Sequence, residues 1–240
     1  MINKTIHYCW FGSNPKPKIV QKCIKSWRKF CPDFEIIEWN ENNFDINICQ
    51  YVKEAYDNKK WAFVSDYARF YVLNRFGGVY VDTDVELIKP IDNFLQNNFT
   101  AFESCSAVAT GLIMACNADN VLCKSMLEEY ESDIFIVDGD LNLKTVCERV
   151  TDILVRNGLK LEDKTQDVLD FKIYDTSYFN PYNMNTGKIE LKPNTISIHH
   201  YAGTWVSKKD KFRGNIYKFI YRIGGKKIAN LARKIFGRKK

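Results

Sequence analysis

The segment that most constrains the fold is WAFVSDYARFYVLNRF, residues 61–76, because it is apolar nearly all round at helical spacing. A helix of this kind has no polar face to turn towards water, so it is expected to be buried on most sides. We expect the helix to be capped by Ser65 and to end at Gly77-Gly78. The run VYVDTDVEL that follows, residues 79–87, predicts a β-strand. A buried helix leading directly into a strand favours a layered α/β fold.

Strand patterns alternate with helical patterns along most of the chain. The predicted strands are 5–12, 34–40, 79–87 and 100–105, the predicted helices are 18–30, 65–78, 118–132 and 143–158, and the late segments 171–182 and 194–205 are expected to form strands and loops. This order predicts a mainly parallel sheet flanked by helices. Ligands of open sheets of this type bind outside the carboxyl ends of the strands.

The length and composition are compatible with one large α/β domain or two small ones. Hydrophobic residues make up 45% and aromatic residues 14% of the 240 positions, enough to fill a sizeable core. The first residues lack the long apolar stretch of a signal peptide, and no apolar run is long enough for a transmembrane helix. The eight cysteines form no C-x-x-C pair, which favours reduced thiols in a cytosolic protein over a zinc site.

The positive charge of the chain is concentrated at its C-terminal end. Residues 208–240 hold 13 Lys and Arg against one Asp, a charge of +12, whereas residues 1–207 hold 22 Lys and Arg against 28 Asp and Glu, a charge of −6. The acidic body argues against a nucleic-acid-binding protein, which spreads positive charge over its folded surface. We therefore expect a body at 1–207, a basic tail at 208–240 and no nucleic-acid partner.

The basic tail has apolar residues at helical spacing. Phe212, Ile216, Phe219 and Ile223 form one series, and Ile228, Leu231 and Ile235 form another after Gly224-Gly225. Basic residues on the other faces predict an amphipathic helix that lies on an anionic membrane surface. The alternative is an ordinary surface helix that packs on its own domain.

Two carboxylates interrupt the predicted strand 79–87. Asp82 and Asp84 would point to one face together with Tyr80, with their Cβ atoms roughly 7 Å apart. Their repulsion is worth on the order of 2 kcal/mol at an effective dielectric constant of about 20, so the pair needs a cation, a basic side chain or water. The D-x-D pattern alone is weak, since 17 aspartates predict about one by chance. A second copy, Asp138-Gly139-Asp140, has the composition of a solvated turn.

The preceding helix supplies the context for this pair. Asp66 and Arg69 are i,i+3 neighbours beside Ser65. A surface ion pair would contribute little, but charges on a buried helix need a specific partner. Both a structural and a functional role are open from the residues alone.

Three segments, in this order along the chain, resemble the retaining glycosyltransferases of family 32: HYCWFG (7–12), WAFVSDYAR (61–69) and FGGVYVDTDV (76–85). That family includes capsular-polysaccharide transferases and is related to the glucosyltransferase domains of clostridial toxins. The resemblance covers residues 1–92 and returns at ISIHHYAGTWVS, 196–207. It implies a GT-A fold in a single catalytic domain, a nucleotide-sugar donor, usually a UDP-sugar, and Mn²⁺ or Mg²⁺.

The resemblance also implies roles for individual residues. Asp82, Asp84 and Arg69 would be catalytic, and Asp82, Asp84 and His200 would hold the metal. Donor binding would fall to Tyr8, Trp10, Ser65, Asp66, Arg69, Tyr80, Asp82, Thr204 and Trp205, with Trp10 stacking on the base and Trp205 closing over the donor. Departures from the family pattern occur at Gly12-Ser13, Tyr201 and Thr204, and they bear on substrate detail.

Alternatives remain for several of these residues. Trp10 could instead belong to the core. His199 and His200 would point to opposite faces of a strand, so at most one would be a ligand, and a lone strand histidine is more often only hydrogen-bonded. His7 is interpreted as structural. Glu103 and the segment 109–111 could face a substrate, but a strand end and a turn explain them equally well.

The expected function is a metal-dependent retaining glycosyltransferase that extends a capsular polysaccharide, a lipopolysaccharide or a lipid-linked oligosaccharide. It would act at the inner face of the cytoplasmic membrane. A toxin-like protein glycosyltransferase is a second possibility, although protein acceptors usually require large helical insertions. A nucleic-acid-binding protein with a basic tail is a third. The transferred sugar, the acceptor and the linkage depend on residues 100–190, where the sequence signals are weakest.

Overall fold

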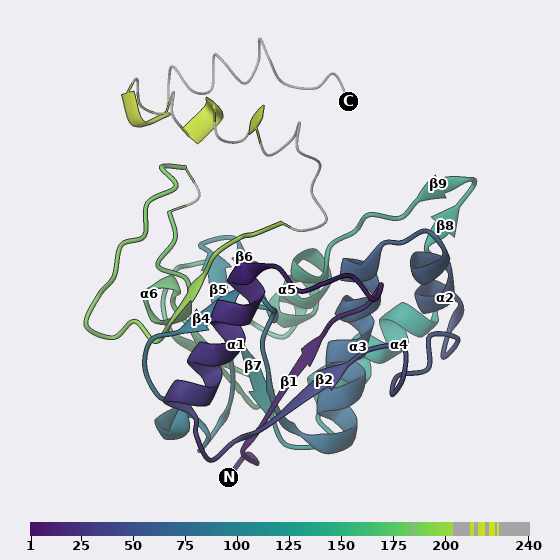
Figure 1. The fold of residues 1–240 in the computed structure, drawn as a ribbon, viewed down its shortest axis with the longest axis horizontal. Helices are drawn as coiled ribbons and strands as arrows, with labels where there is room; N and C mark the ends of the chain where they lie inside the picture. Colours follow the sequence, from purple (N-terminus) through teal and green to yellow (C-terminus); the bar gives the residue numbers. More distant parts are fainter. Residues whose placement is uncertain (184, 204–211, 214–215, 219–220, 224, 226–240) are drawn as a thin grey trace.

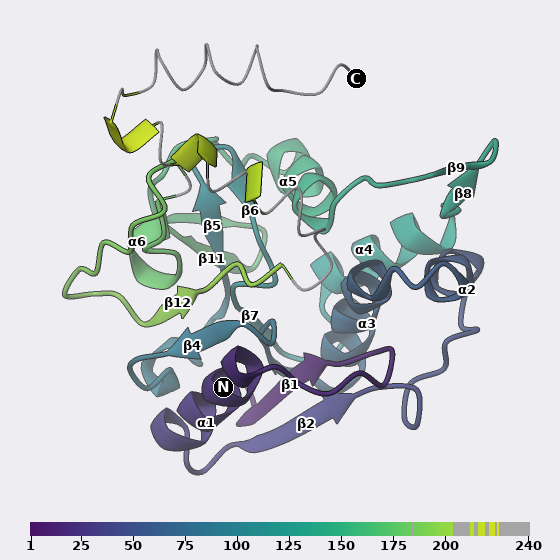
Figure 2. The same cartoon turned by 45° about the horizontal axis from the view of Figure 1, so that its top comes forward.

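The computed structural model describes residues 1–183, 185–203, 212–213, 216–218, 221–223 and 225. Thr204, Trp205, the predicted boundary at residue 207 and most of the basic tail lie outside these residues. Figure 1 shows a central sheet with helices packed against it, and Figure 2 shows the same fold turned forward.

The main sheet has the strand order β10 (Gln166–Val168), β11 (Phe171–Tyr174), β5 (Asn98–Ser104), β7 (Met114–Cys116), β3 (Gly78–Tyr80), β1 (Thr5–Cys9) and β2 (Glu35–Trp39), and β6 (Ala107–Val108) pairs with β5. The pairs β1–β2, β1–β3 and β5–β11 are parallel. β7 is antiparallel to β3 and β5, and β10 is antiparallel to β11. Five strands therefore share one direction, which confirms the predicted mainly parallel α/β sheet.

Helices cover both faces of this sheet. One core contains side chains of α2 (Gln50–Asp57), α3 (Trp61–Phe76), α4 (Val121–Glu131) and α5 (Val146–Arg156), and the other contains side chains of α1 (Lys18–Phe30) and α6 (Thr176–Phe179). Figures 1 and 2 both show α2, α3 and α4 gathered together. A short 3₁₀ turn, η1, spans Asp92–Phe94. Two smaller sheets pair β4 (Val85–Leu87) with β12 (Ser197–His199), and β8 (Ile136–Val137) with β9 (Asp140–Leu141).

The helices form where their periodicity predicts them, although α3 starts earlier than predicted and α4 and α5 are shorter than the predicted 118–132 and 143–158. α1 has the predicted bounds, and α5 begins with a capping box between Thr145 and Glu148. α3 starts at Trp61, four residues before the predicted cap, and ends at Gly77 as predicted. The prediction that Ser65 caps α3 is wrong, because its hydroxyl lies inside the helix and donates to Trp61 O at 3.0 Å. α2 and β7 were not predicted.

The predicted strand 79–87 is two strands. β3 ends at Tyr80, and β4 begins at Val85 in a different sheet. Asp82 and Asp84 lie in the turn between them, so the prediction that they share the face of one strand is wrong. The second D-x-D forms the turn of the β8–β9 hairpin, where Asp138 and Gly139 have φ angles of 52° and 86°. This is the solvated turn that its composition predicted.

Two further observations concern the chain as a whole. All eight cysteines are unpaired thiols. Within the described part of the chain, no helix has both the length and the apolar character needed to span a membrane.

Candidate active site

The turn between β3 and β4, residues 81–84, lies at the carboxyl edge of the parallel strands. Its backbone is held by four hydrogen bonds: Val81 N–H donates to His7 O at 3.2 Å, Asp82 N–H to Gly111 O at 2.8 Å, Val85 N–H to Asp82 O at 3.0 Å, and His200 N–H to Asp84 O at 3.0 Å. The neighbouring strand β1 and the segment before β7 therefore fix where the two aspartates leave the sheet. The strand ends of β1, β5 and β11 lie at the same edge.

Arg69 connects the buried helix α3 with this turn. Its guanidinium is buried and donates through Nη2 to Asp66 Oδ1 at 2.7 Å and to Asp82 Oδ1 at 3.3 Å, and through Nη1 to Thr110 Oγ1 at 3.3 Å. The Tyr80 hydroxyl donates to the same oxygen of Asp82 at 3.1 Å, and the guanidinium lies 4.9 Å from the centre of the Tyr80 ring. The charges that interrupt α3 thus have a specific partner in Asp82.

The protonation of this cluster is governed by its burial. Burial raises the pKa of Asp66 to about 6, although the positive charge of Arg69 opposes the rise. Burial alone would lower the pKa of Arg69, but Asp82, Tyr80 and Asp66 together raise it, so the guanidinium stays charged. The site therefore keeps a permanent buried cation between two carboxyl groups.

Gly111 lies against the carboxylate of Asp82. A Cβ atom added at Gly111 would lie 2.0 Å from Asp82 Oδ2 and 3.1 Å from Arg69 Nη1. Only glycine leaves room for this close approach. The segment 109–111 thus contributes to the cluster, a role that the sequence left open.

Asp84 is held by contacts with β12, the partner of β4 in a small sheet, and with the segment that follows β12. Its Oδ1 lies 3.0 Å from His199 Nε2, and its Oδ2 accepts from Ala202 N–H at 2.7 Å. Burial would raise the pKa of Asp84, but the hydrogen bonds from His199 and Ala202 outweigh it and lower the pKa. Burial would in turn lower the pKa of His199, but the bond to Asp84 and its negative charge raise it. The pair is therefore a carboxylate with a partner that readily carries a proton.

The side chain of His199, and not that of His200, reaches the carboxylate of Asp84, although the backbone N–H of His200 donates to Asp84 O at 3.0 Å. The β4–β12 ladder pairs His199 with Val85, whereas His200 Nε2 lies 2.8 Å from Glu86 Oε2. This geometry does not support His200 as a partner of Asp84, and its assignment as a metal ligand stays a prediction. The Nδ1 atom of His199 is buried without a hydrogen-bond partner among the described residues. The ring of His199 lies 4.0 Å from that of Tyr201.

Two predicted donor-binding residues lie at the end of β1, Tyr8 inside the strand and Trp10 directly after it. Trp10 is partly buried and packs against the core on the α1 side of the sheet, so a role in the core stays open; its Nε1 donates to Asn14 O at 2.7 Å, and Lys16 Nζ lies 5.7 Å from the ring centre. The Tyr8 hydroxyl donates to Glu38 Oε2 at 2.5 Å, and its ring packs against Trp27. Arg69 Nε donates to the backbone oxygen of Ser65 at 3.4 Å. Thr204 and Trp205 lie outside the described residues.

A second group of side chains lines the same edge. Asn180 Nδ2 donates to Glu103 O at 2.7 Å and to the Tyr201 hydroxyl at 2.8 Å. Asn180 was missed because its place depends on contacts between distant segments, and for the same reason the sequence left the roles of Thr110 and His199 open. The described residues include no group of three or more His, Cys, Asp or Glu side chains that could hold a metal ion.

Residues 17–100 match the family model described as a glycosyltransferase sugar-binding region containing a DXD motif. The matched segment contains α3 with Asp66 and Arg69, and the turn with Asp82 and Asp84. Over these residues, about a third of its length, the chain is similar to a glycosyltransferase sugar-binding region. The D-x-D of this region is the pair at 82–84, because the second copy at 138–140 lies outside the match.

The comparison with curated proteins found no match. Among solved structures, the chain is similar to the PaToxG glycosyltransferase, with 17% identity, a TM-score of 0.48 and coverage of 65% of this chain and 68% of that one. It is also similar to a glycosyltransferase involved in glycosylation of the major capsid of PBCV-1, with 10% identity, a TM-score of 0.48 and coverage of 87% and 97%. Both TM-scores are below 0.5, so the interpretation of the sugar-binding region depends on the family model and on the geometry.

Proposed function

We propose that the protein is a metal-dependent retaining glycosyltransferase of the family 32 type, with a GT-A fold. It transfers a hexose from a nucleotide-sugar, a UDP-sugar, to a growing capsular polysaccharide, lipopolysaccharide or lipid-linked oligosaccharide. The observation that carries the proposal is the buried Arg69 cation, which joins Asp66 and Asp82 inside the sugar-binding region. An ordinary surface salt bridge does not require its arginine to be buried as deeply as Arg69.

The chemistry of the cluster suits a sugar ligand. Carboxylate oxygens of Asp66 and Asp82 accept hydrogen bonds from sugar or ribose hydroxyls, and the guanidinium of Arg69 donates in a fixed plane. Because Arg69 is already held by Asp66 and by Thr110, it is oriented before the donor arrives. Trp10, partly buried after the end of β1, would offer a ring face to the base of the nucleotide.

A divalent cation fits the turn when a ligand completes its coordination. Asp82 and Asp84 offer carboxylate oxygens, which Mn²⁺ and Mg²⁺ prefer, and Asp82 is the more exposed of the two. The described residues supply no three-ligand group, so the remaining positions would be filled by the diphosphate and water. Such an ion neutralises the charge of the diphosphate leaving group. Asp82 and Asp84 would hold it, and Arg69 and Asp66 would hold the sugar.

Retention of the anomeric configuration is part of the proposal. The sequence offers no dedicated carboxylate nucleophile, so we favour attack from the face that the diphosphate leaves. Identification of the product anomer by NMR tests this step, and an inverted anomer contradicts it.

The basic tail suggests where the enzyme acts. Residues 208–240 carry a charge of +12, and the described residues among them, 212–213, 216–218, 221–223 and 225, have helical conformation. We propose that the tail binds the inner face of the cytoplasmic membrane, where lipid-linked acceptors are found. Each basic residue near an anionic surface contributes about 1 kcal/mol to such binding.

The test is a panel of UDP-sugars, with release of UDP measured before and after EDTA. The wild-type protein should hydrolyse at least one donor, lose this activity in EDTA and regain it with Mn²⁺. The double variant Asp82→Asn, Asp84→Asn should be inactive, whereas Asp138→Asn, Asp140→Asn, which changes the other D-x-D, should keep full activity. No UDP release from any donor, or equal loss in both variants, would contradict the proposed function.

A further inference from the structure

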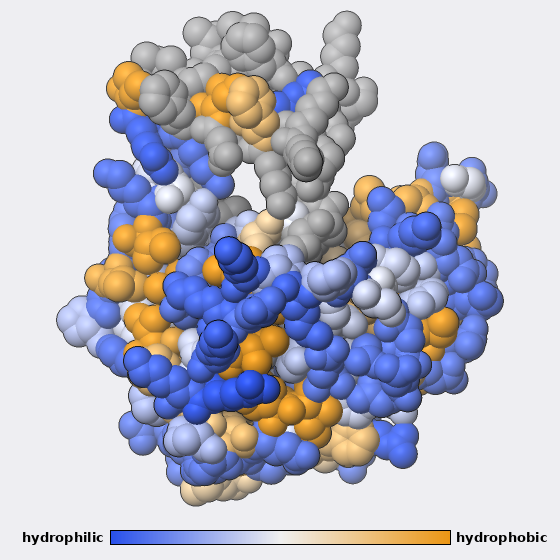
Figure 3. Space-filling view, viewed as in Figure 1, coloured by the Kyte–Doolittle hydropathy of each residue, from blue (hydrophilic) through white to orange (hydrophobic). Residues whose placement is uncertain are grey.

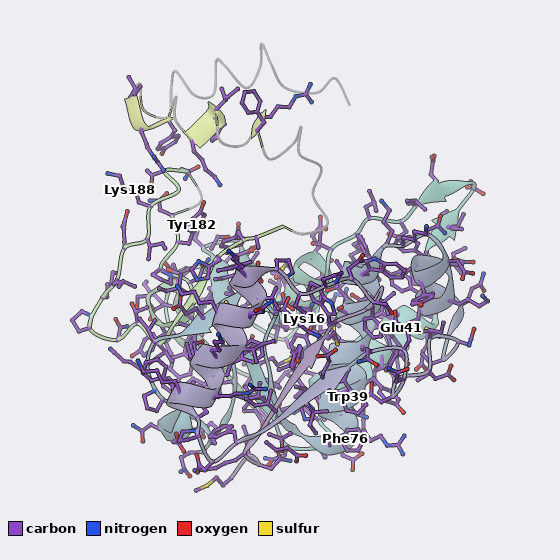
Figure 4. The ribbon with its side chains drawn as sticks, in the orientation of Figure 1. Lys16, Trp39, Glu41, Phe76, Tyr182 and Lys188 are labelled. Carbon is purple, nitrogen blue, oxygen red and sulfur yellow. The ribbon has the colours of Figure 1, made fainter. Side chains whose placement is uncertain are left out.

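A hairpin at residues 181–190 projects from the body of the protein. Tyr182 and Ile189 form an antiparallel bridge, Glu190 N–H donates to Pro181 O at 2.8 Å, and Asn183 N–H donates to Lys188 O at 2.8 Å. Gly187 turns the chain with a φ angle of +65°. Figure 4 shows Tyr182 and Lys188 on this hairpin, directly below the described part of the tail.

The described tail residues contact the hairpin. Lys218 Nζ donates to the Tyr182 hydroxyl at 2.8 Å and lies 5.3 Å from the centre of its ring, and Arg222 Nε donates to Thr186 O. A Cβ atom added at Gly187 would lie 3.0 Å from Arg222 Nη2 and 3.1 Å from Lys218 Cδ. The hairpin and the tail therefore form one surface, although they are about thirty residues apart in the sequence.

This surface combines exposed apolar side chains with basic ones. In the segment KIELK, residues 188–192, which ends the hairpin and continues two residues beyond it, Ile189 is 44% and Leu191 is 59% exposed; Lys188 and Lys192 are exposed beside them, and the exposed Glu190 lies between them. The described tail residues add apolar and basic side chains of the same kind: Phe212, Ile216, Ile223, Arg213 and Arg222. Figure 3 shows apolar groups on the tail at the top of the view and on the left flank below it. Exposed apolar groups gathered among basic ones are typical of an interaction surface.

We propose that residues 186–192 and the described tail residues form a composite membrane face that sits on an anionic lipid bilayer, with Ile189 and Leu191 inserted between the headgroups. Anionic lipid is the occupant that matches the charge of +12 in residues 208–240 and the lysines on both sides of Ile189 and Leu191. The tail alone would supply electrostatic attraction to the lipid. The hairpin adds the insertion of apolar side chains and fixes the orientation of the body relative to the bilayer.

The membrane face adjoins the candidate active site. The ring of Tyr182 lies 5.0 Å from that of Tyr201, which lies 4.0 Å from His199, the partner of Asp84. Binding through the hairpin would bring the bilayer beside the site and present an acceptor whose lipid lies in the membrane. This part of the inference rests on the proposed function, whereas the membrane contact itself does not.

The experiment is cosedimentation of the full chain with vesicles of phosphatidylglycerol and phosphatidylcholine, compared with phosphatidylcholine alone. The test variant is Ile189→Ser, Leu191→Ser. The matched control is Val121→Ser, Leu169→Ser, two aliphatic side chains that are 62% and 47% exposed. They lie at the opposite edge of the sheet, where Asn120 Nδ2 donates to Asp170 Oδ2 at 2.9 Å. Circular dichroism and UDP release confirm that both variants are folded.

We expect wild type and control to bind anionic vesicles equally and more weakly as salt rises. The hairpin variant should bind about tenfold to a hundredfold more weakly, because two aliphatic side chains no longer insert. Equal binding of all three proteins would overturn the inference and leave the tail as the sole anchor. The absence of any vesicle binding would also overturn the inference. Loss of self-association, measured by sedimentation velocity, in place of loss of vesicle binding would assign the face to a second copy of the chain. Failure of the proposed function is a separate result, since it appears as absent UDP release by wild-type protein without vesicles.

Discussion

The substitution Gly111→Ala tests the candidate active site with a single methyl group. The added Cβ would lie 2.0 Å from Asp82 Oδ2, whereas real Cβ contacts essentially never fall below 3.0 Å. The backbone of Gly111 is outside the left-handed region, so alanine is compatible with its conformation. The carboxylate of Asp82, on a turn with one side towards solvent, is the group that can move. We therefore expect a local displacement of about 1 Å at Asp82.

The expected effect on catalysis is large. The hydrogen bonds that Asp82 Oδ1 accepts from Arg69 and Tyr80 are already 3.3 Å and 3.1 Å long, so a shift of this size breaks them. A misplacement of about 1 Å costs roughly a hundredfold in rate, which corresponds to about 2.7 kcal/mol of transition-state stabilisation. The free energy of unfolding should fall by only about 1–3 kcal/mol, the usual range for overpacking.

The assay is kcat/KM for UDP release from the best donor, combined with urea denaturation of the same sample. A double-mutant cycle with Asp82→Ala separates the two causes of a loss. If the methyl group acts through the carboxylate, Gly111→Ala should cost nothing further in the Asp82→Ala background. Wild-type kcat/KM in Gly111→Ala, or an equal loss in both backgrounds, would refute the reasoning.

Three further outcomes are expected. Asp84→Asn should abolish transfer and weaken Mn²⁺ binding, measured by calorimetry, while the protein stays folded; wild-type activity that survives EDTA would contradict this. Trp10→Ala should raise KM for the donor about tenfold to a hundredfold, with little change in the melting temperature, whereas the buried control Trp27→Ala should mainly lose stability. Burial lowers the pKa of His7 from 6.5 to about 4, and Trp39 Nε1 donates to its Nδ1, so the folded state holds the neutral ring. The free energy of unfolding in urea should therefore be highest above pH 6.5 and fall by about 3 kcal/mol towards pH 4, and a His7→Leu variant should lack this part of the pH dependence.

The fold could be predicted to the extent that it depends on local periodicity. The helix at 18–30 and the buried helix ending at Gly77 follow from the spacing of apolar residues, and the structure agrees. The predicted continuous strand at 79–87 shows the limit of this reasoning. Its residues alternate like a strand, but the N–H groups of Val81 and Asp82 donate to the backbone oxygens of His7 and Gly111, and the chain turns there. The hydrogen-bond partners of this turn lie about 30 and 70 residues away in the sequence. They decide whether the strand continues, and local propensity carries no information about them.

The sequence by itself determined that charges on an apolar helix would need a partner, since the cost of burying them is a property of the residues. It also determined which aspartate pair belongs to the sugar-binding region and where the basic charge gathers. Only the tertiary structure decided that Arg69 is that partner for Asp82, that Gly111 packs against its carboxylate, and that His199 rather than His200 faces Asp84. The reason is physical, because β4 and β12 pair across more than a hundred residues of sequence. The register of this pairing selects which histidine side chain faces Asp84, and packing of the whole sheet sets the register.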